Sequence, residues 1–276
     1  MGIRLKRALG ATTYYSSASV LAVLFLTPLV WAGVSSFTGS RANETGQGFG
    51  TDNYVRLFRY GEGLPTYVWN TTAVTVLTVL GTLLVTVAGG YAFARFRFPG
   101  KNLLFLGALA ILMIPHPTIL VPLYTMLRFL NLQNSLASVA AVLTMFQLPF
   151  GLFLMRNAFE ALPRELEEAA LLDGCTPLSA LQHILLRATF PSLVTVGMFA
   201  FLASWNEFMT PLILLSQGSK FTLPIALVSM RSGEMGTVDF GALQAGIVVS
   251  AIPCILVFVL LQRHYVRGFT AGAVRG

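Results

Sequence analysis

Charged residues are scarce in this chain of 276 residues. Asp, Glu, Lys and Arg make up 11% of it, whereas a soluble domain carries roughly a quarter. Cysteines are equally few: Cys175 lies in an acidic stretch and Cys254 within an apolar run, so no disulfide framework is expected. Because 55% of the residues are hydrophobic, the composition is that of a chain whose solvent is largely lipid.

The sequence also lacks the signatures of several functional classes. Gly100-Lys101 is followed by Asn102 and has no upstream glycine of the kind that a phosphate-binding loop requires. The three histidines are scattered, which disfavours an intramembrane enzyme, and no convincing internal repeat suggests a secondary transporter. The net charge of +7 sits at segment ends, so no nucleic-acid surface is indicated. We expect no catalytic residues, no metal ligands and no cofactor bound by this chain.

Six apolar stretches are long enough to cross a bilayer, which takes about 20 residues each. They lie near 16–37, 68–94, 103–127, 135–156, 190–215 and 243–262. Three prolines, Pro115, Pro117 and Pro122, predict a kink in the third stretch. The expected fold is an all-α integral membrane protein, in which residues 1–276 form a single transmembrane domain.

The distribution of Lys and Arg predicts the orientation. With the N-terminus in the cytoplasm, the inner stretches hold twelve of these residues, three in each, and the outer loops hold six. This asymmetry follows the positive-inside rule. Both termini and the segment 157–189 are therefore expected in the cytoplasm, and the loops 38–67 and 216–242 on the outer side.

The inner segment between the fourth and fifth apolar stretches is acidic, with five of the chain's eleven acidic residues in fourteen positions. Pro163 suits the first turn of a helix, and Gly174 suits the left-handed residue that ends one. Thr176 and Pro177 then predict the start of a second helix. The pattern over 163–187 therefore predicts a helix–turn–helix, either a docking element for a basic partner or a solvated acidic loop.

The same segment resembles the EAA loop of permease subunits of bacterial ABC importers. In that loop, Glu-Ala-Ala is followed by three residues and a Gly, and Ile-x-Leu-Pro comes after nine further residues. Matching positions are Glu168, Ala169, Ala170, Gly174, Ile184 and Leu186, whereas Arg187 replaces the family's proline. Further stretches, at 89–101, 204–215, 220–227 and 262–276, resemble carbohydrate-importer permeases of the maltose-transporter type. The chain is most similar to the shorter, six-span partner of the permease pair.

This resemblance implies a type I ABC importer permease in a bacterial cell membrane, with both termini in the cytoplasm. The insert would be the coupling helix, which contacts the ATPase through Glu168, Ala169, Ala170, Asp173 and Gly174. The implied partners are a second permease subunit, a cytoplasmic ATPase dimer that holds ATP and Mg²⁺, and an extracytoplasmic sugar-binding protein. The implied substrate is a sugar, with a solute such as glycerol 3-phosphate as the alternative.

Two further groups of residues are candidates for contacts on the transport path. Glu207 is the one acidic residue within an apolar stretch, where a charge should face protein or water. Trp205, Asn206 and Glu207 border the translocation path or, alternatively, form a structural polar cluster near a kink. By resemblance, the outer loop would contact the binding protein, with Met230, Arg231, Ser232, Gly233 and Glu234 as the candidate residues.

Overall fold

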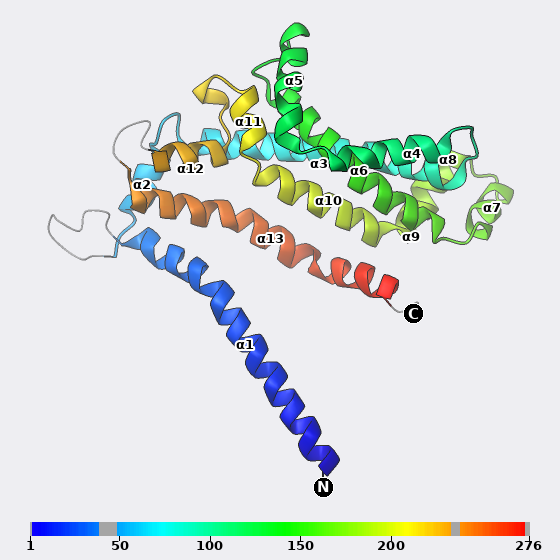
Figure 1. Ribbon diagram of the computed structural model, residues 1–276, viewed down its shortest axis with the longest axis horizontal. Coiled ribbons are helices and arrows are strands. Elements are labelled where there is room, and N and C mark those ends of the chain that lie inside the picture. The colour runs from blue at the N-terminus through cyan, green and yellow to red at the C-terminus, as the bar shows by residue number, and fades with distance from the viewer. Residues whose placement is uncertain (1, 39–48, 233–237, 274–276) are drawn as a thin grey trace. The chain divides into compact units, whose positions relative to one another are not determined.

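The computed structural model describes residues 2–38, 49–232 and 238–273. Apart from one bridge that pairs Thr38 with Phe49, every regular element in these residues is a helix. The first five α-helices are α1 (Gly2–Phe37), α2 (Asp52–Phe58), α3 (Leu64–Arg95), α4 (Lys101–Ala110) and α5 (His116–Phe129). Next come α6 (Leu136–Glu160), α7 (Glu165–Leu172), α8 (Pro177–Ala180), α9 (Leu186–Ala188) and α10 (Phe190–Trp205). The last are α11 (Met209–Leu214), α12 (Leu223–Ser232) and α13 (Phe240–Ala273) (Figure 1).

Among the residues that the structure describes, four helices are long and apolar enough to cross a membrane: Thr13–Phe37 of α1, α3, α6, and Phe240–Gln262 of α13. Two bent pairs raise the number to as many as six if each pair is one span. In the first pair, Lys101–Met113 meets His116–Phe129 at 105°, so the kink predicted from the prolines is confirmed. Extended Pro115 separates the two helices of this pair.

The fifth apolar stretch differs from the expectation. Residues 190–215 do not form a continuous helix, because α10 ends at Trp205 and α11 begins only at Met209. In the second bent pair, α10 instead follows Pro177–Ala188 at an angle of 81°. The break is not visible in the hydropathy of this stretch, because the apolar residues on both sides outweigh the short polar sequence Asn206-Glu207.

The chain divides into two compact units, and each has its own apolar core. One unit comprises Met1–Leu64 and Leu227–Ile252, with a core of Leu57, Met230, Ala242 and Ala245. The other comprises Pro65–Ala226 and Pro253–Gly276. This unit has two buried clusters, and α3 and α6 contribute to both. The first also includes residues of α5, α11 and α12. The second also includes residues of α10 and of the segment after Pro177.

Helices α3 and α6 pack closely against each other at the centre of the larger unit's two buried clusters. At Gly90 a Cβ atom would lie 2.6 Å from Met155 Cβ and 3.0 Å from the backbone nitrogen of Arg156. Small residues allow helices to approach this closely within a membrane. Buried threonines line the same face of α3, and the Thr144 hydroxyl donates to the Thr78 carbonyl at 3.4 Å. The polar residues of the second apolar stretch, 68–94, thus lie in a buried helix interface.

Candidate functional site

The acidic insert folds as two helices joined by a tight turn. Gly174 has φ +86°, its N–H donates to the Leu171 carbonyl at 3.1 Å, and the Cys175 N–H donates to the Ala170 carbonyl at 3.0 Å. These two bonds form the Schellman arrangement that ends a helix at a left-handed glycine. Thr176 then accepts a bond from the Ser179 N–H at 3.3 Å and starts the second helix. The local roles predicted for Gly174 and Thr176 are confirmed.

The helix boundaries of the insert differ from the prediction at its start. The first helix, α7, begins at Glu165, so Pro163 precedes the helix by two residues instead of lying in its first turn. The second helix continues from Pro177 through a π-helical turn (Leu181–Leu185) to Ala188, past Arg187. Arginine at 187 does not interrupt it, whereas Pro191 is tolerated in the first turn of α10.

The insert presents the residues singled out from the sequence in two different ways. Glu168, Ala169, Asp173 and Gly174 are exposed, whereas Ala170 is buried. Apolar side chains accompany the exposed carboxylates: Leu166, Leu171, Leu172 and Leu178, of which Leu172 is 88% exposed. An exposed patch that combines apolar and acidic groups is typical of a docking surface for another protein.

The two halves of the insert are attached to the larger unit by different chemistry. In the second half, Leu181 and Leu185 are buried against Tyr91, Phe159 and Val196. In the first half, the contact is polar: the Tyr91 hydroxyl and Glu167 Oε1 are 2.5 Å apart, and Arg95 Nε is 3.2 Å from Glu167 Oε2. Sequence reasoning did not single out Glu167. The available signal was Tyr91 and Arg95, which stand four residues apart on one helix face.

Trp205, Asn206 and Glu207 lie at the break between α10 and α11. Glu207 Oε1 accepts hydrogen bonds from the Thr210 N–H at 2.8 Å and from the Thr210 hydroxyl at 3.0 Å. The carboxylate therefore caps the first turn of α11, as a side-chain acceptor does at a helix N-terminus. Asn206 is exposed, and its amide donates to the Leu202 carbonyl at 2.9 Å. These bonds favour a structural role for Glu207.

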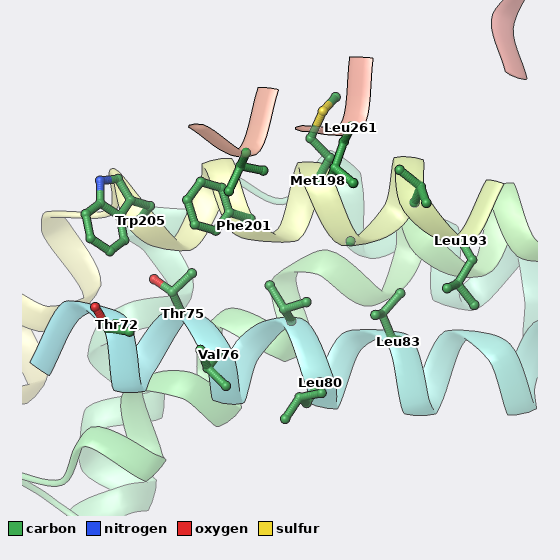
Figure 2. Close-up of a pocket in the computed structure, with 14 residues that line it drawn as sticks. Thr72, Thr75, Val76, Leu80, Leu83, Leu193, Met198, Phe201, Trp205 and Leu261 are labelled. Carbon is green, nitrogen blue, oxygen red and sulfur yellow. The ribbon is translucent and has the colours of Figure 1, made fainter. Parts of the chain in front are cut away.

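Trp205 is buried and contributes to an apolar pocket. Its ring stacks on Phe201 with centroids 5.8 Å apart, and both rings line a cavity of about 380 Å³ between α3, α10 and Val257 and Leu261 of α13. Figure 2 shows the aliphatic side chains that form most of this wall. Few groups there could bind sugar hydroxyls, so the cavity is suited to apolar chains.

The candidate loop residues near 230 are divided between core and surface. Met230 is buried in the core of the smaller unit, while Arg231 and Ser232 are exposed. Gly233 and Glu234 lie outside the described residues. The segment that leads into α12 is fixed to the start of α3, because the Asn70 amide donates to the carbonyls of Ser219 and Phe221, each at 2.9 Å.

No cluster of three His, Cys, Asp or Glu residues suited to a metal ion occurs in the part of the chain that the structure describes. The apolar helices are those of an α-helical integral membrane protein, and the insert carries an exposed surface of apolar and acidic side chains.

Residues 81–270 match the family described as binding-protein-dependent transport system inner membrane component, and the chain belongs to this family. It is therefore an inner-membrane permease of an ABC transporter, as the resemblance of the EAA loop indicated. The probable ABC transporter permease protein YurM of Bacillus subtilis is 33% identical, over 95% of this chain and 90% of the relative. The diacetylchitobiose uptake system permease protein DasC of Streptomyces coelicolor is 34% identical, over 94% of this chain and 95% of the relative.

Among solved structures, the fold is similar to a chain of a bacterial ABC transporter involved in the import of the acidic polysaccharide alginate. The TM-score is 0.78 at 23% identity, with 94% of this chain and 97% of that chain covered. At this identity the likeness concerns the fold alone.

Proposed function

We propose that this chain is the permease subunit of an ATP-driven importer that moves a sugar, from a mono- to an oligosaccharide, into the cell by alternating access. It forms one transmembrane permease domain with six spans, and both termini lie in the cytoplasm. A relative named for diacetylchitobiose uptake, of nearly the same length, supports the carbohydrate class. A non-sugar solute such as glycerol 3-phosphate is the alternative substrate for the same machinery.

The observation that carries this proposal is the placement of two polar attachments at opposite ends of α3. Asn70 binds the segment before α12 near one end, and Arg95 pairs with the insert at the other. At 1.5 Å per residue, these positions are about 37 Å apart along the helix, more than the roughly 30 Å of a bilayer core. Together with the asymmetry of Lys and Arg, this spacing supports a cytoplasmic insert and an outer segment 216–242.

In this arrangement the insert 163–187 is the coupling element. Glu168 and Asp173 offer charges for charge-assisted contacts with basic groups of a separate ATPase dimer, and Leu172 enters an apolar part of its surface. Ala169 keeps the exposed side of α7 thin, and buried Ala170 and the turn at Gly174 hold α7 against the second helix. Closure of the ATPase around ATP and Mg²⁺ then moves the insert, and rigid-body motion of the helices follows.

The exposed surfaces outside the insert indicate where the remaining partners would bind. The large apolar side chains exposed along α1 and α13 would be covered by lipid and by a second permease subunit. On the outer side, Arg231, Ser232 and the adjoining Gly233 and Glu234 would contact the sugar-binding protein, while buried Met230 anchors this loop. At the α10–α11 break, exposed Asn206 would border the path, with Trp205 and Glu207 supporting it.

Transport by the reconstituted complex tests the proposal. The permease pair, its ATPase and its binding protein are placed in proteoliposomes, and uptake of radiolabelled maltose, diacetylchitobiose and glycerol 3-phosphate is measured with and without ATP. We expect ATP-dependent uptake of a sugar. Uptake of glycerol 3-phosphate alone would favour the alternative substrate, and uptake without ATP would contradict the importer mechanism.

A further inference from the structure

The first helix of the insert has little apolar attachment to the spanning helices. Of its eight residues only Ala170 is buried, whereas the second half of the insert places Leu181 and Leu185 in the core cluster with Tyr91 and Phe159. A short, exposed helix has low local stability unless a specific contact holds it. Glu167 supplies such a contact to α3.

Glu167 lies between two side chains from the last turns of α3. Its Oε1 accepts from the Tyr91 hydroxyl at 2.5 Å, and its Oε2 is 3.2 Å from Arg95 Nε. The side chains of Arg95 and Glu167 are only 7% and 15% exposed. The same guanidinium donates through its Nη2 to the Leu162 carbonyl at 3.1 Å, just before the insert. One arginine thus holds both α7 and the chain that leads into it.

Adjacent glutamates therefore have different surroundings. Successive residues of an α-helix point about 100° apart, and here Glu167 faces α3 while Glu168 is exposed. Charges this deeply buried are found where they are paired, because an unpaired charge is costly to remove from water. The Tyr91 ring itself packs edge-on against Phe96 and Phe159, so its hydroxyl is held in place for Glu167.

We propose that Glu167, held by Arg95 and Tyr91, is a positioning residue that makes α7 a rigid extension of α3. It transmits force from the docking face of the insert to the transmembrane helices. This inference rests on the proposed function, since it concerns the same insert. Between Asn70 and Arg95, α3 is one continuous helix without proline. Asn70 and Thr71 bond to Ser219, Phe221 and Leu223, so movement at one end of α3 reaches the segment fixed at the other.

The test compares three anchor variants with two matched controls. Glu167→Gln and Arg95→Gln each remove one charge of the pair, and Tyr91→Phe removes only the hydroxyl. Glu165→Gln and Arg97→Gln remove the same charges from exposed positions on the same helix or just beyond its end. In each reconstituted complex, the amount of bound ATPase, the rate of ATP hydrolysis and the sugar imported per ATP are measured.

We expect the charge variants to keep the ATPase bound and hydrolysing, but to import less sugar per ATP. Mutations in a coupling network change the coupling by between about two- and thirtyfold. We expect the sugar imported per ATP to fall by a factor in this range, and to fall less in Tyr91→Phe. A nitroxide on Leu172→Cys, with Cys175 and Cys254 replaced by serine, should become more mobile in Glu167→Gln and stay unchanged in Glu165→Gln. The exchanged pair, Arg95→Glu with Glu167→Arg, should regain part of the coupling that each single change loses.

Two results would overturn this inference while leaving the proposed function intact. Sugar import per ATP at the wild-type value in Glu167→Gln would show that the ion pair transmits nothing. Glu168→Lys reverses a charge on the exposed side of α7 and should weaken ATPase binding. An equal loss of ATPase binding in Glu167→Gln would make Glu167 part of the docking face instead. The proposed function fails separately, if Glu168→Lys retains both bound ATPase and normal uptake.

Discussion

Replacing Gly174 tests the turn on which the geometry of the insert depends. Alanine at this position meets no atom within 4 Å, so its effect is backbone strain alone. A left-handed φ costs a residue with a Cβ roughly 1–2 kcal/mol, which corresponds to about a five- to thirtyfold loss of the native turn. Asparagine tolerates this conformation better and should lose less than alanine.

Proline at position 174 should be the most harmful substitution. Its ring holds φ near about −65°, whereas Gly174 has φ +86°. It also removes the N–H that binds the Leu171 carbonyl. The turn cannot form with proline, and the two helices of the insert would be redirected. We therefore expect the order glycine, asparagine, alanine, proline, from most to least active.

The assay is the amount of ATPase that co-purifies with the permease, together with sugar uptake at equal abundance in the membrane. Gly107→Ala is the matched control, because it adds a Cβ in open space within α4 without a positive φ. It should leave both quantities unchanged. Uptake at the wild-type rate in the asparagine, alanine and proline variants would show that the left-handed turn is not needed.

Three further outcomes are expected. Cys175 should react with a membrane-impermeant thiol reagent only after cells are opened. Labelling of Cys175 in intact cells would contradict the predicted cytoplasmic position of the insert. Glu207→Ala removes both bonds to Thr210 and should lower the stability of the purified complex by about 1 kcal/mol, whereas Glu207→Gln keeps an acceptor and should lose less; equal thermal midpoints would argue against capping. Gly90→Leu forces a side chain against the Met155 backbone and should cost about 1–3 kcal/mol, seen as a lower unfolding midpoint; an unchanged midpoint would mean that α3 and α6 are not closely packed.

The turn of the insert could be predicted from the sequence because Gly174, Thr176 and Pro177 each restrict the backbone locally. Long apolar runs likewise predicted most of the helices. The break after Trp205 could not be found in this way, because the residues on both sides of it are apolar. It depends on Glu207, which caps a new helix through Thr210.

The roles of the adjacent glutamates illustrate another limit. Glu167 and Glu168 are chemically identical, and the sequence pattern favoured Glu168 through the EAA motif. Which of them faces α3 depends on how the insert packs against Tyr91 and Arg95, more than 70 residues earlier in the chain. Met230 shows the same effect, since burial against Leu57 and Ala242 removes a candidate contact residue from the surface.

Photo-cross-linking from Leu172 tests the central claim most directly. This leucine is the most exposed large apolar residue of the insert, and a benzoylphenylalanine at 172 would lie on the proposed docking face. In intact cells that express the whole transporter, we expect the cross-linked partner, identified by mass spectrometry, to be the ATP-binding subunit, and the yield to fall in Glu168→Lys. Cross-linking to lipid or to an outer-side protein, with no ATP-binding subunit captured, would contradict the assignment of this insert as the coupling element.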